Sequence, residues 1–324
     1  MTIKNWQPPS EINNFRLYLP IIHPDNPESI SSHHEIYLDV DAQFEKLWNT
    51  QPPHIDYLFE SLCQLIRYLM PLIKQEQHTV NVYQKEAAFD LVTEMDQGIE
   101  YLIRHWIKKH FPDHKIIGEE FGQDIVTPND FYWFLDPIDG TSNYAKGTDS
   151  YCLNLVCLHQ GKPFLTIVAF PAINKIYSLN IKSNENISIP EQQICSEFYS
   201  ERKQEDVFFD LINKKLQRSR LKNNALGYSL TEMFLGKCDV FYKANVKLWD
   251  VMAPAALLYF QQDHYWDIEL MTYSGDIISP FSNKPSFIDY LNTRHADNCR
   301  VGLFSVTAKS DQRSKHIIRE IVYA

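Results

Sequence analysis

The spacing of apolar positions along the chain predicts two long helices followed by a group of strands. Six apolar residues recur at the three- and four-residue spacing of an amphipathic helix that runs from Asp56 to about residue 75: Leu58, Leu62, Leu65, Ile66, Leu69 and Ile73. A second helix is predicted from Asp96 to Phe111, because Pro112 cannot continue it. Short apolar runs then predict strands at 115–118, 131–135, 151–159, 164–170 and 175–181.

The second half of the chain predicts helices and strands in alternation. Polar, turn-rich residues 182–206 predict a boundary between two subdomains. Beyond it, the pattern predicts helices near 207–218, 229–235, 249–262, 282–292 and 310–322, and strands near 238–242, 265–271 and 300–306. Residues 1–54 are rich in proline and show little periodicity, which predicts an irregular extension with at most short elements. The expected organisation is an N-terminal extension at 1–54, one subdomain at 55–181 and an α/β subdomain at 182–324.

Composition and charge narrow the class of protein. The 324-residue chain is 44% hydrophobic, and no apolar run approaches the roughly 18 residues that would span a bilayer. Its formal net charge of −10 argues against nucleic-acid polymers and membrane surfaces as partners, because either would repel an acidic surface. The N-terminus lacks the apolar stretch of a signal peptide, so we expect a cytoplasmic protein with reduced, mostly buried thiols. The cysteines are scattered along the chain: Cys63, Cys152, Cys157, Cys195, Cys238 and Cys299.

Two aspartates, Asp136 and Asp139, lie three residues apart directly after the predicted strand at 131–135. Pro137 fixes its φ angle, so we expect the strand to end there in a rigid corner. The Ile138 carbonyl can point between the two carboxylates, and three such oxygen donors suit Mg²⁺. In isolation, the same pattern is also typical of an Asx turn that caps the next helix.

Other residues at the ends of predicted elements could also bind phosphate or metal. Gly140 allows close backbone approach, and Thr141 can begin a helix whose free amides would hold a phosphate oxygen. Glu119 follows the strand at 115–118, and Asp96 stands where the second helix begins. Each acid alone is more typical of a helix cap or a solvated charge, but several at the ends of neighbouring elements favour a metal site.

Four motifs in order resemble those of the inositol monophosphatase family, the metal-dependent, lithium-sensitive phosphomonoesterases. They are Lys85 with DLVTEMD (90–96), GEE (118–120), DPIDGTSNY (136–144) and LWDVMAP (248–254). The likeness covers about residues 57–324. It implies an α/β fold, the layered αβαβα sandwich shared with fructose-1,6-bisphosphatase, and a homodimer.

The resemblance implies a role for each matched residue. Two or three Mg²⁺ ions would be held by Glu119, Asp136, the Ile138 carbonyl, Asp139 and Asp250, with Asp96 on the most weakly held ion. The implied catalytic residues are Glu119 and Thr141, which would jointly orient and deprotonate the attacking water, and Asp96. The implied phosphate- or substrate-binding residues are Gly140, Thr141, Lys85, Lys243 and Gly227. Trp249 would pack beneath the helix that begins at Asp250, although Lys85 and Trp249 also fit a solvated lysine and an ordinary core aromatic.

The half of the chain that would select the substrate departs from the family pattern. Lys243 stands where the family usually has an acid, and it would favour a second anionic group over a neutral polyol unless it is a rim lysine that points to water. The segment WDVMAP also resembles the branch that cleaves 3′-phosphoadenosine 5′-phosphate, but Thr231 stands where that branch commonly has lysine. The glycine-rich hairpin usual in the family is shortened or missing at 182–200.

The predicted function is therefore a Mg²⁺-dependent phosphomonoesterase that acts on a small phosphorylated metabolite such as an inositol monophosphate. The alternatives are a 3′(2′),5′-bisphosphate nucleotidase, a sugar bisphosphatase and a non-catalytic binding protein of the same fold. An inorganic pyrophosphatase would also cluster acids around Mg²⁺, but it would not predict this motif order. A zinc hydrolase is disfavoured because the chain has no H-E-x-x-H motif.

Overall fold

The computed structural model describes most of the chain after residue 54. The described residues are 55–80, 82–84, 91–180, 193–195, 210–212, 214–217, 219–221, 223, 225–261, 265–281, 285–293 and 299–323, with three two-residue strands before them. Those strands are β1 (Lys4–Asn5), β2 (Ile21–Ile22) and β3 (Ile30–Ser31). The rest of the predicted extension, the boundary segment at 182–192 and Lys85 lie outside the described residues.

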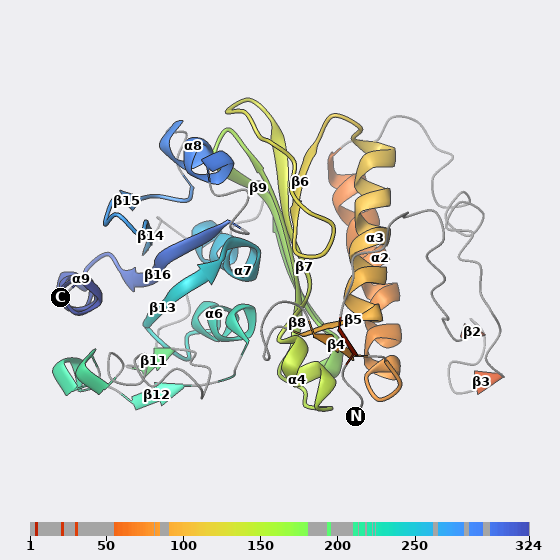
Figure 1. Cartoon of the computed structure of the whole chain (residues 1–324), viewed down its shortest axis with the longest axis horizontal. Coiled ribbons are helices and arrows are strands. Elements are labelled where there is room, and N and C mark those ends of the chain that lie inside the picture. The colour runs from red at the N-terminus through yellow and green to blue at the C-terminus, as the bar shows by residue number, and fades with distance from the viewer. Residues whose placement is uncertain are drawn as a thin grey trace.

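The first two layers are a helix pair and a five-stranded sheet (Figure 1). Helices α2 (Ile55–Glu76) and α3 (Glu94–His110) match the two predicted long helices and pack on one face of the sheet. The strand order is β10-β9-β8-β7-β6, with bounds β6 (Lys115–Gly118), β7 (Phe131–Asp139), β8 (Cys152–His159), β9 (Lys162–Phe170) and β10 (Lys175–Asn180). Their core joins apolar residues of both helices to one face of the strands. The short elements β4 (Val82–Gln84), β5 (Leu91–Thr93), α4 (Thr141–Ala145) and η2 (Pro171–Ile173) complete this half.

A second helix pair separates this sheet from another. Helices α6 (Leu226–Phe234) and α7 (Leu248–Phe260) pack against the opposite face of the first sheet, and α7 is buried on nearly every side. The second sheet has the order β12-β11-β13-β16-β14-β15, with bounds β11 (Gln193–Cys195), β12 (Ser219–Leu221), β13 (Val240–Lys247), β14 (Trp266–Met271), β15 (Ile277–Ile278) and β16 (Arg300–Ala308). Helix α8 (Pro285–Thr293) precedes β16.

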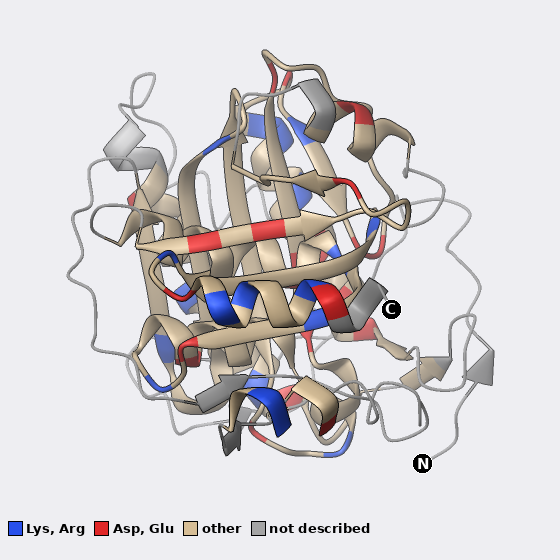
Figure 2. Ribbon diagram, turned by 90° about the vertical axis from the view of Figure 1, so that its left-hand side faces the viewer, with Lys and Arg blue, Asp and Glu red and all other residues tan. Residues whose placement is uncertain are grey.

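Helix α9 (Gln312–Tyr323) forms the last layer, so the predicted αβαβα sandwich is confirmed. In Figure 2 the Lys and Arg residues of α9 (blue) lie close to Asp and Glu residues (red) of a strand in the second sheet. Lys315 Nζ lies 2.8 Å from Asp267 Oδ2 and 2.7 Å from Glu269 Oε1 on β14. These half-buried ion pairs stabilise the packing of α9 on the second sheet.

Two sequence expectations need correction. The strand predicted at 131–135 continues through Pro137 to Asp139, because the extra residues are absorbed by a bulge in the pairing with β8. The expectation of six reduced cysteines is wrong for Cys238, which is disulfide-bonded, whereas four others are free and buried: Cys63, Cys152, Cys157 and Cys299. Among the described helices, none is long and apolar enough to cross a bilayer.

Candidate metal and phosphate site

The bulge in β7 places two acids on one face of the first sheet. Asp136 pairs with Asn154 of β8, and Asp139 pairs with Cys152, so β7 has two residues between these pairs where β8 has one. Cys152 and Asn154 are two residues apart in a strand and therefore share a face. Without the bulge, residues three apart would point to opposite faces. Pro137 lies inside the bulge, a position where proline is tolerated within a sheet although it has no N–H to donate.

Three carboxylates from separate elements meet at this face. Glu119 follows β6, Asp136 lies in β7 and Asp250 is in the first turn of α7; one oxygen of each lies within 4.8 Å of the others. Asp136 is 1% exposed, and its Oδ1 is buried with no hydrogen-bond partner among the residues that the structure describes. A donor set made only of oxygens, with a buried oxygen left without a partner, fits a hard divalent cation such as Mg²⁺.

The acids also disturb one another's protonation. Burial raises the pKa of Asp136 well above its ordinary value, and the charges of Glu119, Asp139, Asp250 and Asp96 raise it further. Burial likewise raises the pKa of Asp250, with Asp139 and Glu119 adding to the rise. Such a concentration of buried negative charge opposes folding unless protons or cations neutralise it.

Asp139 is held by the start of α6. Its Oδ2 accepts a hydrogen bond from the Gly227 N–H at 2.6 Å, and its Oδ1 accepts one from the Leu226 N–H at 3.3 Å. Burial raises the pKa of Asp139 to about 7, although these two amides favour the ionised form. A Cβ on Gly227 would meet the Asn154 side chain at 2.6 Å, so glycine is needed for this close packing. The predicted contact of Gly227 with substrate stays a prediction.

Asp96 and Thr141, two of the predicted catalytic residues, are hydrogen-bonded to each other. Asp96 is fully buried and closes a capping box with Thr93 at the start of α3. Its Oδ1 accepts a hydrogen bond from Thr141 Oγ1 at 3.1 Å, and the same hydroxyl lies 3.0 Å from the Ile138 carbonyl oxygen. Helix α4 begins at Thr141 with Gly140 as its N-cap residue at a φ of 90°, a conformation that favours glycine.

Lys247 belongs to the site and was not anticipated from the sequence. Its Nζ lies 2.7 Å from Glu119 Oε1 and 5.5 Å from the centre of the Trp249 ring. Its charge lowers the pKa of Asp250, against the larger effects of burial and the neighbouring acids. The only sequence signal was a lysine two residues before Trp249 of the W-D pair, and the strand predicted near 238–242 in fact continues to this lysine.

We expect Lys247→Met to lower the free energy of unfolding of the metal-free protein by about 2 kcal/mol, because Glu119 would lose its counter-charge. Saturating Mg²⁺ should reduce this loss, since the bound cation neutralises the same acids. Urea unfolding in EDTA and in Mg²⁺ measures both values. Lys315→Met removes an ion-paired lysine far from the cluster and should cost the same in both conditions. Equal losses in both conditions for Lys247→Met would contradict the prediction.

Lys243 is the last predicted substrate residue that the structure describes. It lies in β13, opposite Phe304 of β16, and is only 4% exposed. It is therefore not the rim lysine of the simpler alternative. Trp249, 1% exposed, packs within the core that surrounds α7, as expected.

Comparison with known proteins decides the family. The model of the inositol monophosphatase family matches residues 54–259, more than half of the chain. The chain belongs to the inositol monophosphatase family. A fructose-1,6-bisphosphatase/inositol-1-monophosphatase of Thermotoga maritima is 29% identical over 184 residues, covering 53% of this chain and 70% of that protein. A Nus factor SuhB of Xylella fastidiosa is 24% identical over 194 residues, covering 56% of this chain and 70% of that protein.

A solved structure supports the fold of this family member. The crystal structure of an IMPase/NADP phosphatase complexed with Mg²⁺ and phosphate superposes with a TM-score of 0.62 at 22% sequence identity, covering 82% of this chain and 94% of that chain. Family and neighbours together indicate a phosphatase. The three acids of the cluster, Glu119, Asp136 and Asp250, all lie within the residues that the family model matches.

Proposed function

We propose that this protein is a Mg²⁺-dependent phosphomonoesterase that hydrolyses a small phosphorylated metabolite such as an inositol monophosphate. The observation that carries the proposal is the cluster of Glu119, Asp136 and Asp250, with Asp139 held beside it and Thr141 linked to Asp96. Lithium inhibition and a homodimer follow from the family alone, and the cytoplasmic location rests on the sequence; all three stay predictions.

The side chains divide the work of hydrolysis between them. Mg²⁺, when bound by the acids, would polarise the phosphate ester, lower the pKa of the attacking water and stabilise the leaving alkoxide. Thr141 and Glu119 orient that water, and Glu119 accepts its proton. The new O–P bond forms as the P–O bond to the leaving alcohol breaks; the alkoxide takes a proton from solvent water, and Glu119 returns its proton to solvent. The backbone amides of Gly140 and Thr141 hold the phosphate oxygens.

Cys152 lies beside Asp139 and is a candidate for a covalent nucleophile, but its environment disfavours that role. Its Sγ lies 3.5 Å from Asp139 Oδ2. Burial raises the pKa of the thiol well above its ordinary value, and the charges of Asp139 and Asp136 add to the rise. A thiol that stays protonated is a poor nucleophile, so direct attack by water is the simpler chemistry.

Phosphate release by the purified protein in Mg²⁺ tests the proposal. We would compare kcat/KM for inositol 1-phosphate, 3′-phosphoadenosine 5′-phosphate and fructose 1,6-bisphosphate. Preference for the inositol ester is the expected result, and preference for either bisphosphate would establish one of the alternatives. Release from none of the esters by a protein that binds Mg²⁺ would favour a non-catalytic binding protein, an alternative kept because some relatives are named as Nus factors.

A bisphosphate substrate is the second candidate, and a specific observation favours it. Lys243 is buried in β13, whereas Lys247 of the same strand and Arg300, its partner on β16, act electrostatically on Asp250. Because Lys247 is paired with Glu119, the charges that would suit a second phosphate on the substrate are those of Lys243 and Arg300, which lie on the paired strands β13 and β16.

We expect Lys243→Glu to lower kcat/KM for the two bisphosphates by about tenfold or more, with inositol 1-phosphate affected much less. The reason is that the substitution replaces attraction of a second phosphate by repulsion, and a tenfold change corresponds to about 1.4 kcal/mol. Steady-state kinetics with the three esters checks this. Lys162→Glu makes the same charge change at the exposed start of β9 and should alter no ratio. Equal losses on all three esters would contradict a role for Lys243 in specificity.

A further inference from the structure

The turn that carries Glu119 is held by hydrogen bonds along its backbone. The Gly118 N–H donates to the Gly122 carbonyl at 3.2 Å, which folds the turn back on itself. The Glu119 N–H donates to the carbonyl of Leu135 at 3.3 Å, directly before Asp136 in β7. The next two N–H groups, at positions 120 and 121, donate to a side chain instead.

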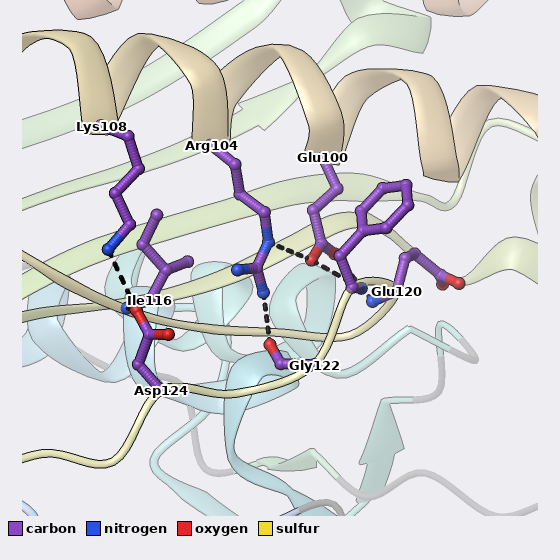
Figure 3. Close-up of polar contacts among 8 residues, drawn as sticks. Glu100, Arg104, Lys108, Ile116, Glu120, Gly122 and Asp124 are labelled. Carbon is purple, nitrogen blue, oxygen red and sulfur yellow. Dashed lines mark hydrogen bonds and ion pairs between the residues drawn. The ribbon is translucent and has the colours of Figure 1, made fainter. Parts of the chain in front are cut away.

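That side chain is Glu100 of α3 (Figure 3). Its Oε2 accepts the Glu120 N–H at 2.8 Å, and its Oε1 accepts the Phe121 N–H at 3.1 Å. Arg104, one helical turn further on, donates from Nε to Glu100 Oε1 at 2.7 Å and from a terminal NH₂ to the Gly122 carbonyl. Glu100 and Arg104 thus contact both sides of the turn, and Glu100 is fully buried.

The protonation state and the sequence agree with this arrangement. Burial raises the pKa of Glu100, while the Arg104 charge and the two amides oppose that rise. All three of these neighbours donate to the carboxyl group, which is the pattern that an ionised acceptor satisfies. Gly118 is required beside it, because a Cβ there would meet Glu100 Oε1 at 2.2 Å.

We propose that Glu100, held by Arg104, is the positioning residue that sets the place of Glu119 and thereby the affinity of the acidic cluster for divalent metal. The proposal rests on the proposed function only in that it treats Glu119 as a metal ligand. A carboxylate that must reach a cation shared with Asp136 and Asp250 needs a fixed backbone. Two charge-assisted hydrogen bonds directly after it supply that constraint.

Binding of Mn²⁺ to the metal-free protein, followed by electron paramagnetic resonance of the free ion, tests this without any substrate. In Glu100→Gln, an amide NH₂ replaces one acceptor oxygen and faces a backbone N–H, and the charge opposite Arg104 is lost. We expect the Kd for Mn²⁺ to rise about tenfold or more, the usual size of an outer-sphere effect on metal affinity. The half-saturating Mg²⁺ concentration for phosphate release should rise by the same factor, with KM for the ester at saturating Mg²⁺ within about twofold of wild type.

Asp124→Asn is the matched control, because Asp124 follows β6 in the chain and also contacts a residue of α3, Lys108. Asp124 Oδ2 accepts the Ile116 N–H at 2.9 Å and lies 3.2 Å from Lys108 Nζ, so it also joins the helix to β6, but at the end of the strand away from Glu119 (Figure 3). The Asp124→Asn substitution should leave the Kd for Mn²⁺ within about twofold of wild type. Should Glu100→Gln fail to fold, Arg104→Lys keeps the charge but loses the forked donor, and it should raise the Kd about threefold.

Each outcome decides the proposal. An unchanged Kd in folded Glu100→Gln, or an equal change in Asp124→Asn, would overturn it, because a merely structural role lowers the folded fraction without altering affinity. A wild-type protein that binds Mn²⁺ but hydrolyses no ester would defeat the proposed function, and the comparison of Kd values would still decide the role of Glu100. A wild-type protein that binds no Mn²⁺ would contradict both.

Discussion

Asp136→Asn is expected to lower kcat/KM for phosphate release by about 10³-fold or more. Asp136 belongs to the cluster, and one of its oxygens is buried with no hydrogen-bond partner in the described part of the chain. The amide cannot supply the negative charge that a divalent cation needs, so the transition state loses several kcal/mol of stabilisation. Steady-state kinetics over a range of Mg²⁺ concentrations measures the loss.

The same substitution should have the opposite effect on the metal-free fold. Neutralising one of several buried carboxylates removes like-charge repulsion, so we expect the free energy of unfolding in EDTA to rise by about 1–2 kcal/mol. Mg²⁺ should then add little further stability. The control is Asp267→Asn. It removes a carboxylate of β14 that is paired with Lys315 of α9, and it should leave activity intact. Wild-type activity in Asp136→Asn would show that the cluster is not the catalytic centre.

Stability of the metal-free protein is expected to fall as pH rises from about 4 to about 7. An aspartate in the unfolded chain titrates near 3.8, whereas burial raises the pKa of folded Asp139 to about 7. Between these values the folded state binds more protons than the unfolded state, so raising the pH favours unfolding. For Asp139 alone the loss reaches at most about 4 kcal/mol, and the raised pKa values of Asp136 and Asp250 act in the same direction.

Urea unfolding in EDTA across this pH range checks the prediction. In Mg²⁺ the fall should weaken or reverse, because the cation binds the deprotonated carboxylates and its affinity rises with pH. Asp139→Asn should flatten the dependence in EDTA. A metal-free stability that stays constant or increases from pH 4 to 7 would contradict the raised pKa values.

Regular elements could be predicted from the sequence because their signals are local. The apolar spacing placed α2 and α3, and the strands of the first sheet appear near their predicted positions. The end of β7 was missed because a proline after an acid usually stops a strand. Only the pairing with β8 shows that the chain forms a bulge there, and that pairing is not visible in a local pattern.

The site residues that could be predicted are likewise those with a local sequence signal, and the missed ones depend on contacts between distant segments. The acids of the cluster stand in motifs with fixed spacing, so the sequence could name them. Glu100 and Arg104 could not be named, since a glutamate and an arginine four residues apart on a helix are most often a solvated pair. Lys247 was missed because its role depends on Glu119, which is distant in the sequence and meets it only when both sheets are in place.

The bulge at Pro137 makes the count of residues between two acids as important as their identity. Asp136 and Asp139 share a face only because β7 has one residue more than β8 between the paired positions. A change of side chain inside the bulge leaves that count intact. Loss of a single residue would leave the two acids two apart and still on one face of a regular strand, but it would remove the bulge and the local bend that the bulge gives to β7. Among homologues, this segment should therefore vary in composition but never in length.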